Sequence, residues 1–211
     1  MAETESTSRE VPELTVALDV PSARNLADKA SVIQDLQFVM DACMRLLDEM
    51  AKPEDDRDEV VPLALWSAAL AAYGRCFGAG GRPGLTVEDV ESLSLQGAVR
   101  KFHEWVIGER DRLTQHPADP FDAAKIGAIL APAGQQRQVQ GVAVFSASRV
   151  LIDVTGVRQL GGLASELAKQ TAIKAQEQQD KLLTVARKLD VASLYALPPL
   201  YAQPSPADGK P

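Results

Sequence analysis

The sequence has few of the residues that usually carry redox or metal chemistry. Its 211 residues include two cysteines and two histidines, and neither type occurs at the CxxC or HxxxH spacing that suits a zinc ion. Cys43 and Cys76 both lie within apolar helical patterns, so we interpret them as small buried hydrophobic residues and not as a disulfide framework. These absences predict a protein that needs no metal ion and no other cofactor.

Aromatic residues and long hydrophobic runs are also scarce. Aromatic side chains make up 5% of the chain, and alanine and leucine dominate its apolar residues, a composition that favours helices over a β-sandwich. The N-terminal stretch MAETESTSRE is polar, and no run of about 18 apolar residues occurs. With 45% hydrophobic residues the chain can still bury a core. We therefore expect a soluble, cytoplasmic protein that has no contact with a membrane.

The chain is acidic, with a formal net charge of −7 and a sequence pI of about 4.9. An acidic surface repels a nucleic-acid backbone over most of its area. Any contact with RNA would therefore be local, and no DNA specificity is indicated.

Composition and periodicity divide the chain into five segments. Residues 1–12 and the proline-rich tail, 191–211, are expected to be disordered. Between them we predict a helical bundle (13–122), a β-hairpin (123–148) and a long C-terminal helix (149–190). The predicted fold class is thus mainly α: a helical bundle with a β-hairpin insertion and a long C-terminal helix.

Three helices are predicted within the bundle. Apolar residues recur at three- and four-residue steps from Leu26 to Met50, which is typical of an amphipathic helix. A second helix, 58–77, is apolar nearly all round, as a central bundle helix should be. The third runs from Ser94 to His116. Its predicted buried stripe is Leu95, Val99, Phe102, Val106 and Leu113.

The segment after the bundle changes to a β pattern. Residues 124–131 and 137–147 contain β-branched side chains, with AGQQR between them, which predicts the two strands of a hairpin. Because an isolated hairpin is only marginally stable, we expect it to pack on the helices. The helix that follows, 157–189, has a polar middle that either projects into solvent or binds a protein partner.

Both histidines fall in one stretch, HEWVIGERDRLTQHPADPFD, at 103–122. On a helix, His103 and Arg110 are seven residues apart and share a face. His116 precedes Pro117, and the residue before a proline is driven out of the helical conformation. Unwinding at that point, or a two-fold dimer, would bring Arg110 and His116 together.

The arrangement Arg110-Asp111-x4-His116 resembles the R-x4–6-H motif of the HEPN (higher eukaryote and prokaryote nucleotide-binding) superfamily. The preceding helix strengthens the resemblance, because WSAALAAYGRCF at 66–77 is similar to the W-x-A-A-L-x-x-Y-x-R-C-F helix of a bacterial branch of helical proteins. In that branch an H…RD…H helix follows, which His103, Arg110, Asp111 and His116 match. The resemblance covers residues 30–122 and includes neither the hairpin nor the C-terminal helix.

The resemblance implies a small helical bundle that forms a homodimer and acts on RNA or nucleotides. Many HEPN proteins are metal-independent endoribonucleases of a defence or toxin type, and others bind nucleotides or partners without catalysis. In the catalytic case His116 would be the general acid or base at a ribose 2′-hydroxyl, and Arg110 would stabilise charge on the phosphate. Asp111 would orient one of them, and His103 would be a second acid or base.

Structural roles account for the same residues. His103 also fits a partly buried side chain that a neighbour satisfies, and His116 interacts favourably with a helix dipole in any case. The carboxylates available for an ion pair with Arg110 are Glu104, Asp111 and Asp122. The alternative hypothesis is therefore a non-catalytic module for protein interaction or oligomerisation through the C-terminal helix. The cations that would attract RNA near this stretch are Arg75, Arg82, Arg100, Lys101, Arg110 and Arg112.

Overall fold

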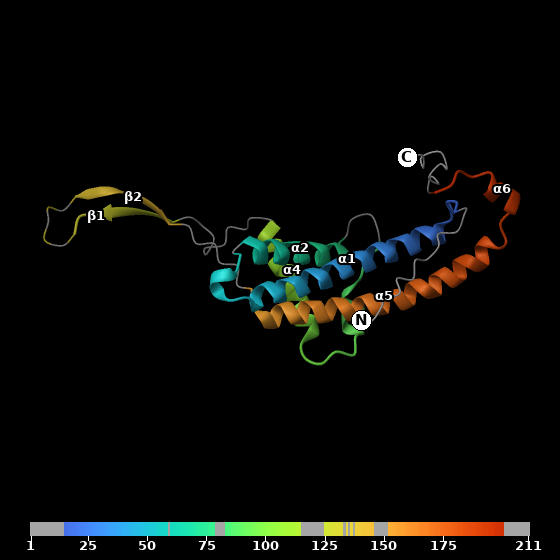
Figure 1. Cartoon of the computed structure of the whole chain (residues 1–211), viewed down its shortest axis with the longest axis horizontal. Helices are drawn as coiled ribbons and strands as arrows, with labels where there is room; N and C mark the ends of the chain where they lie inside the picture. The colour runs from blue at the N-terminus through green and yellow to red at the C-terminus, as the bar shows by residue number, and fades with distance from the viewer. Residues whose placement is uncertain are drawn as a thin grey trace, which may run out of the picture. The chain divides into compact units, whose positions relative to one another are not determined.

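The computed structural model describes residues 15–58, 60–78, 83–114, 125–132, 134, 136, 138–145 and 152–200. Over these residues the fold is mainly helical with one antiparallel hairpin and a long C-terminal helix, as predicted (Figure 1). The chain divides into two compact units, Asp28–Ile173 and the terminal segments Met1–Ala27 with Lys174–Pro211. No helix in the described ranges is both long and apolar enough to cross a bilayer. The segment 1–12, expected to be disordered, lies outside those ranges.

Two helices that lie wholly or mostly in the larger unit follow the predicted periodicity. The first, α1 (Pro21–Ala51), begins at Pro21 and not at Leu26, because proline is well suited to the first position of a helix. The second, α2 (Val60–Cys76), lies within the predicted range 58–77. The buried positions of α1 recur every three or four residues and include Val32, Leu36, Val39, Cys43 and Leu46.

A short helix, α3 (Val87–Glu91), precedes α4 (Val99–Thr114). The predicted start of α4 at Ser94 is wrong, because Gly97 has a φ of 94°, a left-handed conformation that interrupts a helix and that glycine adopts readily. Leu95 therefore precedes the helix and is exposed, outside the predicted buried stripe. The other members of the stripe are buried or pack against the core: Val99, Phe102, Val106 and Leu113.

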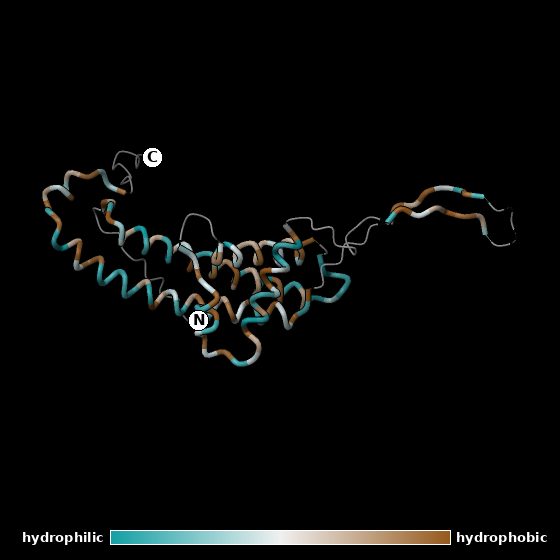
Figure 2. Tube along the Cα trace, turned by 180° about the vertical axis from the view of Figure 1, so that it is seen from behind, coloured by the Kyte–Doolittle hydropathy of each residue, from teal (hydrophilic) through white to brown (hydrophobic). Residues whose placement is uncertain are grey.

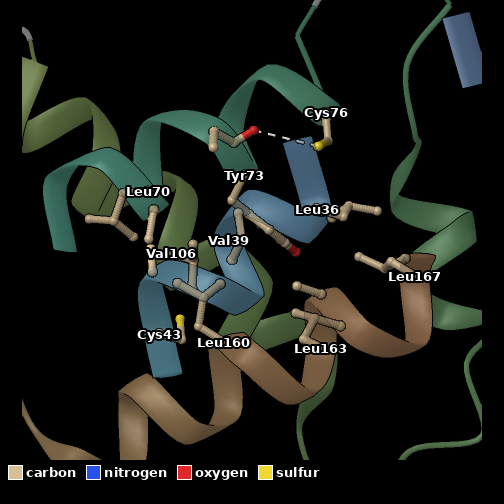
Figure 3. Close-up of a cluster of buried hydrophobic side chains, with 14 of the residues drawn as sticks. Leu36, Val39, Cys43, Leu70, Tyr73, Cys76, Val106, Leu160, Leu163 and Leu167 are labelled. Carbon is tan, nitrogen blue, oxygen red and sulfur yellow. Dashed lines mark hydrogen bonds between the residues drawn. The ribbon is translucent and has the colours of Figure 1, made fainter. Parts of the chain in front are cut away.

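The core of the larger unit is assembled from several helices, including the first part of α5 (Val154–Ala186) (Figure 3). Full burial of each apolar side chain contributes about 1.5–3 kcal/mol. Cys43 and Cys76 are both buried and neither forms a disulfide, as predicted, and burial raises the pKa of Cys43 to about 12. The core side chains drawn in Figure 3 include Leu36 and Val39 of α1, Leu70 and Tyr73 of α2, Val106 of α4, and Leu160, Leu163 and Leu167 of α5.

The smaller unit contains the second half of α5, in which none of the side chains from Lys174 to Lys181 is buried. The following residues differ from the disorder expected for 191–211. A short helix, α6 (Val191–Tyr195), begins where the Asp190 carboxylate accepts hydrogen bonds from two backbone N–H groups, a common N-cap. Pro199 forms a β-bridge with Val16. The rest of the predicted tail, 201–211, is not among the described residues.

The hairpin consists of β1 (Lys125–Leu130) and β2 (Val139–Phe145), paired antiparallel close to the predicted bounds. Its large apolar side chains are exposed, and Figure 2 shows hydrophobic residues along both strands. The expectation that the hairpin buries these side chains against the helices is therefore wrong for the described chain.

Candidate functional site

His103 lies where α4 packs against α2. The residue is 4% exposed, and its Nδ1 lies 2.9 Å from the hydroxyl of Tyr73 on α2. The imidazole also contacts Phe77, with the ring centroids 4.5 Å apart. Tyr73 is itself fully buried, so this hydrogen bond satisfies two polar groups that would otherwise be unpaired within the core. The bond ties the middle of α4 to α2.

The surroundings of His103 favour its neutral form. Burial lowers the pKa of His103, and the nearby Arg100 lowers it further, while Glu104 opposes both effects. Burial also raises the pKa of Tyr73 well above its usual range, so the phenol keeps its proton. Tyr73 is then the donor and Nδ1 of His103 the acceptor, which leaves the imidazole hydrogen on Nε2. A buried neutral imidazole with such a partner fits the structural role given above for His103.

Arg110 lies near the C-terminal end of α4, on the face that also carries His103. Its guanidinium donates to Oδ1 of Asp111 through Nε at 2.9 Å and Nη2 at 2.5 Å. The side chain of Arg110 is 27% exposed and that of Asp111 is 40% exposed. The ion pair is thus at the protein surface, where Asp111 fixes the direction of a half-buried guanidinium.

Gly74 of α2 makes room for this arginine. A Cβ placed on residue 74 would lie 2.5 Å from Nη1 and 3.1 Å from Nε of Arg110, so any larger residue would displace the guanidinium. A glycine inside a helix costs roughly 1 kcal/mol relative to alanine and often marks a close approach. The glycine within WSAALAAYGRCF is therefore a signal in the sequence for this contact.

The structure joins His103 and Arg110 to neighbouring residues of α2, Tyr73 and Gly74. Trp66 and Tyr73 are core residues and do not form an exposed stacking surface. His116 lies outside the described residues, so its predicted approach to Arg110 stays a prediction.

Most of the arginines expected to attract RNA form ion pairs. Besides the pair of Arg110 with Asp111, the described pairs are Arg75 with Asp35 at 2.7 Å, Arg100 with Glu91 at 2.6 Å and with Glu104 at 2.8 Å, and Arg112 with Glu109. The carboxylates raise the pKa of Arg75 and Arg100 by hydrogen bonding. RNA that binds to this part of the chain would have to exchange these carboxylates for phosphates, which limits the net electrostatic gain.

A cleft at the start of α4 does not coincide with these residues. This cleft, of about 490 Å³, lies at the opposite, N-terminal end of α4 and is lined by Gly97, Lys101, Phe102 and Leu163 among others. Neither His103 nor Arg110 lines it. Within the described ranges, no group of three or more metal-binding side chains is assembled.

Comparisons with protein-family models, with curated proteins and with solved structures find no match to this chain. The HEPN resemblance therefore depends on the residues of the α2 and α4 segments alone.

Proposed function

We propose that the chain is a HEPN-like protein that cleaves RNA without a metal ion, with Arg110 and His116 at its site. The observation that carries the proposal is the placement of Arg110. Its half-buried guanidinium lies against Gly74 and is oriented by Asp111, at the end of the helix that leads to His116. A pre-oriented guanidinium is suited to bind a phosphate, because little side-chain entropy is lost on binding.

In the proposed reaction, His116 accepts the proton of a ribose 2′-hydroxyl, and the 2′-oxygen attacks the neighbouring phosphorus. The bond from phosphorus to the 5′-oxygen breaks, and a general acid protonates that oxygen. The products are a 2′,3′-cyclic phosphate and a 5′-hydroxyl end. Arg110 stabilises the charge that develops on the phosphoryl oxygens. We assign the acid to His116 of a second copy in a homodimer, because His103 is buried and hydrogen-bonded to Tyr73.

Labelled RNA incubated with the purified chain in EDTA tests this proposal. We expect His116→Ala to lower the cleavage rate about 10²–10⁴-fold and Arg110→Ala to lower it about 10²–10³-fold. The matched control is Arg112→Ala. It removes the same charge two residues away from Arg110, and the side chain of Arg112 pairs with Glu109. It should retain the rate within about threefold, since one peripheral phosphate contact affects binding only weakly.

Thermal unfolding of each variant shows whether a lost rate reflects the site or the fold. Equal rates in all three variants, or cleavage that EDTA abolishes, would overturn the proposal.

The ion pairs of Arg75, Arg100 and Arg112 favour a second candidate, a non-catalytic interaction module. In that case the charged residues of α4 fix the helix and do not bind phosphate. The same assay tests it: the folded chain then cleaves no RNA, and Arg110→Ala changes thermal stability alone.

A further inference from the structure

The cleft at the start of α4 has the size and the lining of a site for a small molecule. Its volume of about 490 Å³ falls within the roughly 300–1,000 Å³ of ligand pockets, which are mostly apolar with a few polar groups. One wall comes from residues 95–102 and the other from α5, both within the larger unit. The large apolar side chains of the lining are Leu95, Val99, Phe102 and Leu163.

Gly162, on the α5 wall, leaves space in this cleft. A Cβ placed on residue 162 would meet no atom within 4 Å, whereas one on the neighbouring Gly161 would lie 3.4 Å from the Cβ of Cys43. Helix packing therefore leaves little room at Gly161, while nothing in the described structure fills the space beside Gly162. A glycine inside a helix is less favourable than alanine, so the absent side chain has a cost in stability that the open cleft explains.

The polar groups of the lining favour an anion. Among the described residues that line the cleft, Lys101 alone is charged, although acidic residues outnumber basic ones by 29 to 22 in the whole chain. Gln96 and Gln159 also line the cleft, and their side-chain amides can donate hydrogen bonds. A cation in this cleft would meet the ammonium of Lys101 without a carboxylate to pair with.

The acidic residues beside the cleft pair with a different cation. An adjoining hollow that shares Lys101 is lined by Glu91 and Arg100, which form an ion pair at 2.6 Å. Glu104 also pairs with Arg100, at 2.8 Å. Within the described part of the chain, no ion pair holds the ammonium of Lys101, so it is available to a bound anion.

We propose that this cleft binds a small amphipathic carboxylate, with its apolar body against Leu95, Phe102 and Leu163 and its carboxylate beside Lys101. One ammonium group matches one negative charge. A phosphate monoester carries roughly −1.5 to −2 at neutral pH, more than the single cation of this lining balances. The proposal does not depend on RNA cleavage, because none of these residues belongs to the proposed site.

Calorimetric titration of the full chain with sodium decanoate, below its micelle concentration, tests the class of ligand. We expect saturable binding of one decanoate per chain. Decylammonium has the same apolar body with the opposite charge and should bind at least about tenfold more weakly. Equal binding of the two would show that apolar contact alone is responsible and would overturn the proposal, as would the absence of saturable decanoate binding.

The variant Lys101→Met tests the cation, because it removes the charge and keeps most of the apolar stem. It should raise the dissociation constant of decanoate at least about tenfold. Lys181→Met is the matched control, since Lys181 is an exposed lysine of α5 that does not line the cleft, and it should leave the constant within about threefold. An unchanged constant in Lys101→Met would contradict the proposal.

The variant Gly162→Leu tests the space, because its side chain would occupy the cleft. Decanoate binding should weaken at least about tenfold. In the control Gly108→Leu, a Cβ also meets nothing within 4 Å but lies outside the cleft, and binding should stay within about threefold. Melting temperatures establish that both variants fold, and a folded Gly162→Leu chain that binds decanoate as the wild type does would overturn the proposal. If Gly162→Leu does not fold, Lys101→Met and decylammonium decide the question.

Discussion

His103 and Arg110 share one face of α4 and both contact α2, but their surroundings differ. His103 is almost completely buried and is hydrogen-bonded to a phenol. Arg110 is partly exposed and is bonded to a surface carboxylate. Two residues on the same helix face can therefore have different roles, because burial decides which polar side chain belongs to the core and which can reach a ligand. We assign the first to the fold and the second to the site.

The largest effect is expected from the partner of His103. Tyr73→Ala removes a fully buried aromatic ring and leaves the imidazole without its hydroxyl donor, which should lower the free energy of unfolding by about 3–5 kcal/mol. Tyr195→Ala is the matched control, since Tyr195 is 72% exposed, and should change it by no more than about 0.5 kcal/mol. Urea unfolding gives both values, and similar losses in the two variants would contradict the assignment.

Gly74→Ala tests the position of Arg110 most directly. The added methyl group displaces the end of a flexible arginine, so the fold should tolerate it while RNA cleavage falls about tenfold, or 1.4 kcal/mol. Gly108→Ala in α4 is the control, because a Cβ there meets nothing within 4 Å. It should gain roughly 0.5–1 kcal/mol of stability with an unchanged rate. A fully active Gly74→Ala variant would show that the position of Arg110 does not matter.

A smaller effect concerns pH. Burial lowers the pKa of His103 below its ordinary value of 6.5, so the unfolded chain binds the proton more readily and stability falls as the pH drops below that value. His103→Gln removes this titration. Its melting temperature should therefore fall less than that of the wild type between about pH 7.5 and about pH 5.5, a range above the ordinary carboxylate pKa values. If the melting temperatures of the variant and the wild type fall equally with pH, the imidazole of His103 is not buried in its neutral form.

The smallest effect is expected for Asp111→Asn. Its ion pair with Arg110 is near the surface, and exposed pairs contribute about 0–1 kcal/mol. The free energy of unfolding of this variant in denaturant should therefore differ from that of the wild type by no more than about 1 kcal/mol. A loss above about 2 kcal/mol would place Arg110 in the structural class with His103 and remove the contrast between them.

The sequence predicts the helices and strands better than the contacts between them. Periodicity indicates α1, α2 and the hairpin, because each buried or alternating pattern is local. The start of α4 was misplaced because the conformation of Gly97 is not visible in an apolar pattern.

The contacts of His103 and Arg110 with α2 could not be predicted from the sequence. The bond from Tyr73 to His103 joins residues 30 positions apart, and no short-range signal selects that partner. Gly74 was the one local indication, since a glycine within an apolar helix suggests a close approach, but it does not reveal that Arg110 is the group approaching.

The rates of RNA cleavage by His103→Gln and Arg110→Ala, measured side by side on folded protein in EDTA, test the division between the two residues most directly. We expect His103→Gln to keep the cleavage rate within about threefold of the wild type, and Arg110→Ala to lower it about 10²-fold or more. A folded His103→Gln variant that is inactive, beside an Arg110→Ala variant that still cleaves, would contradict it.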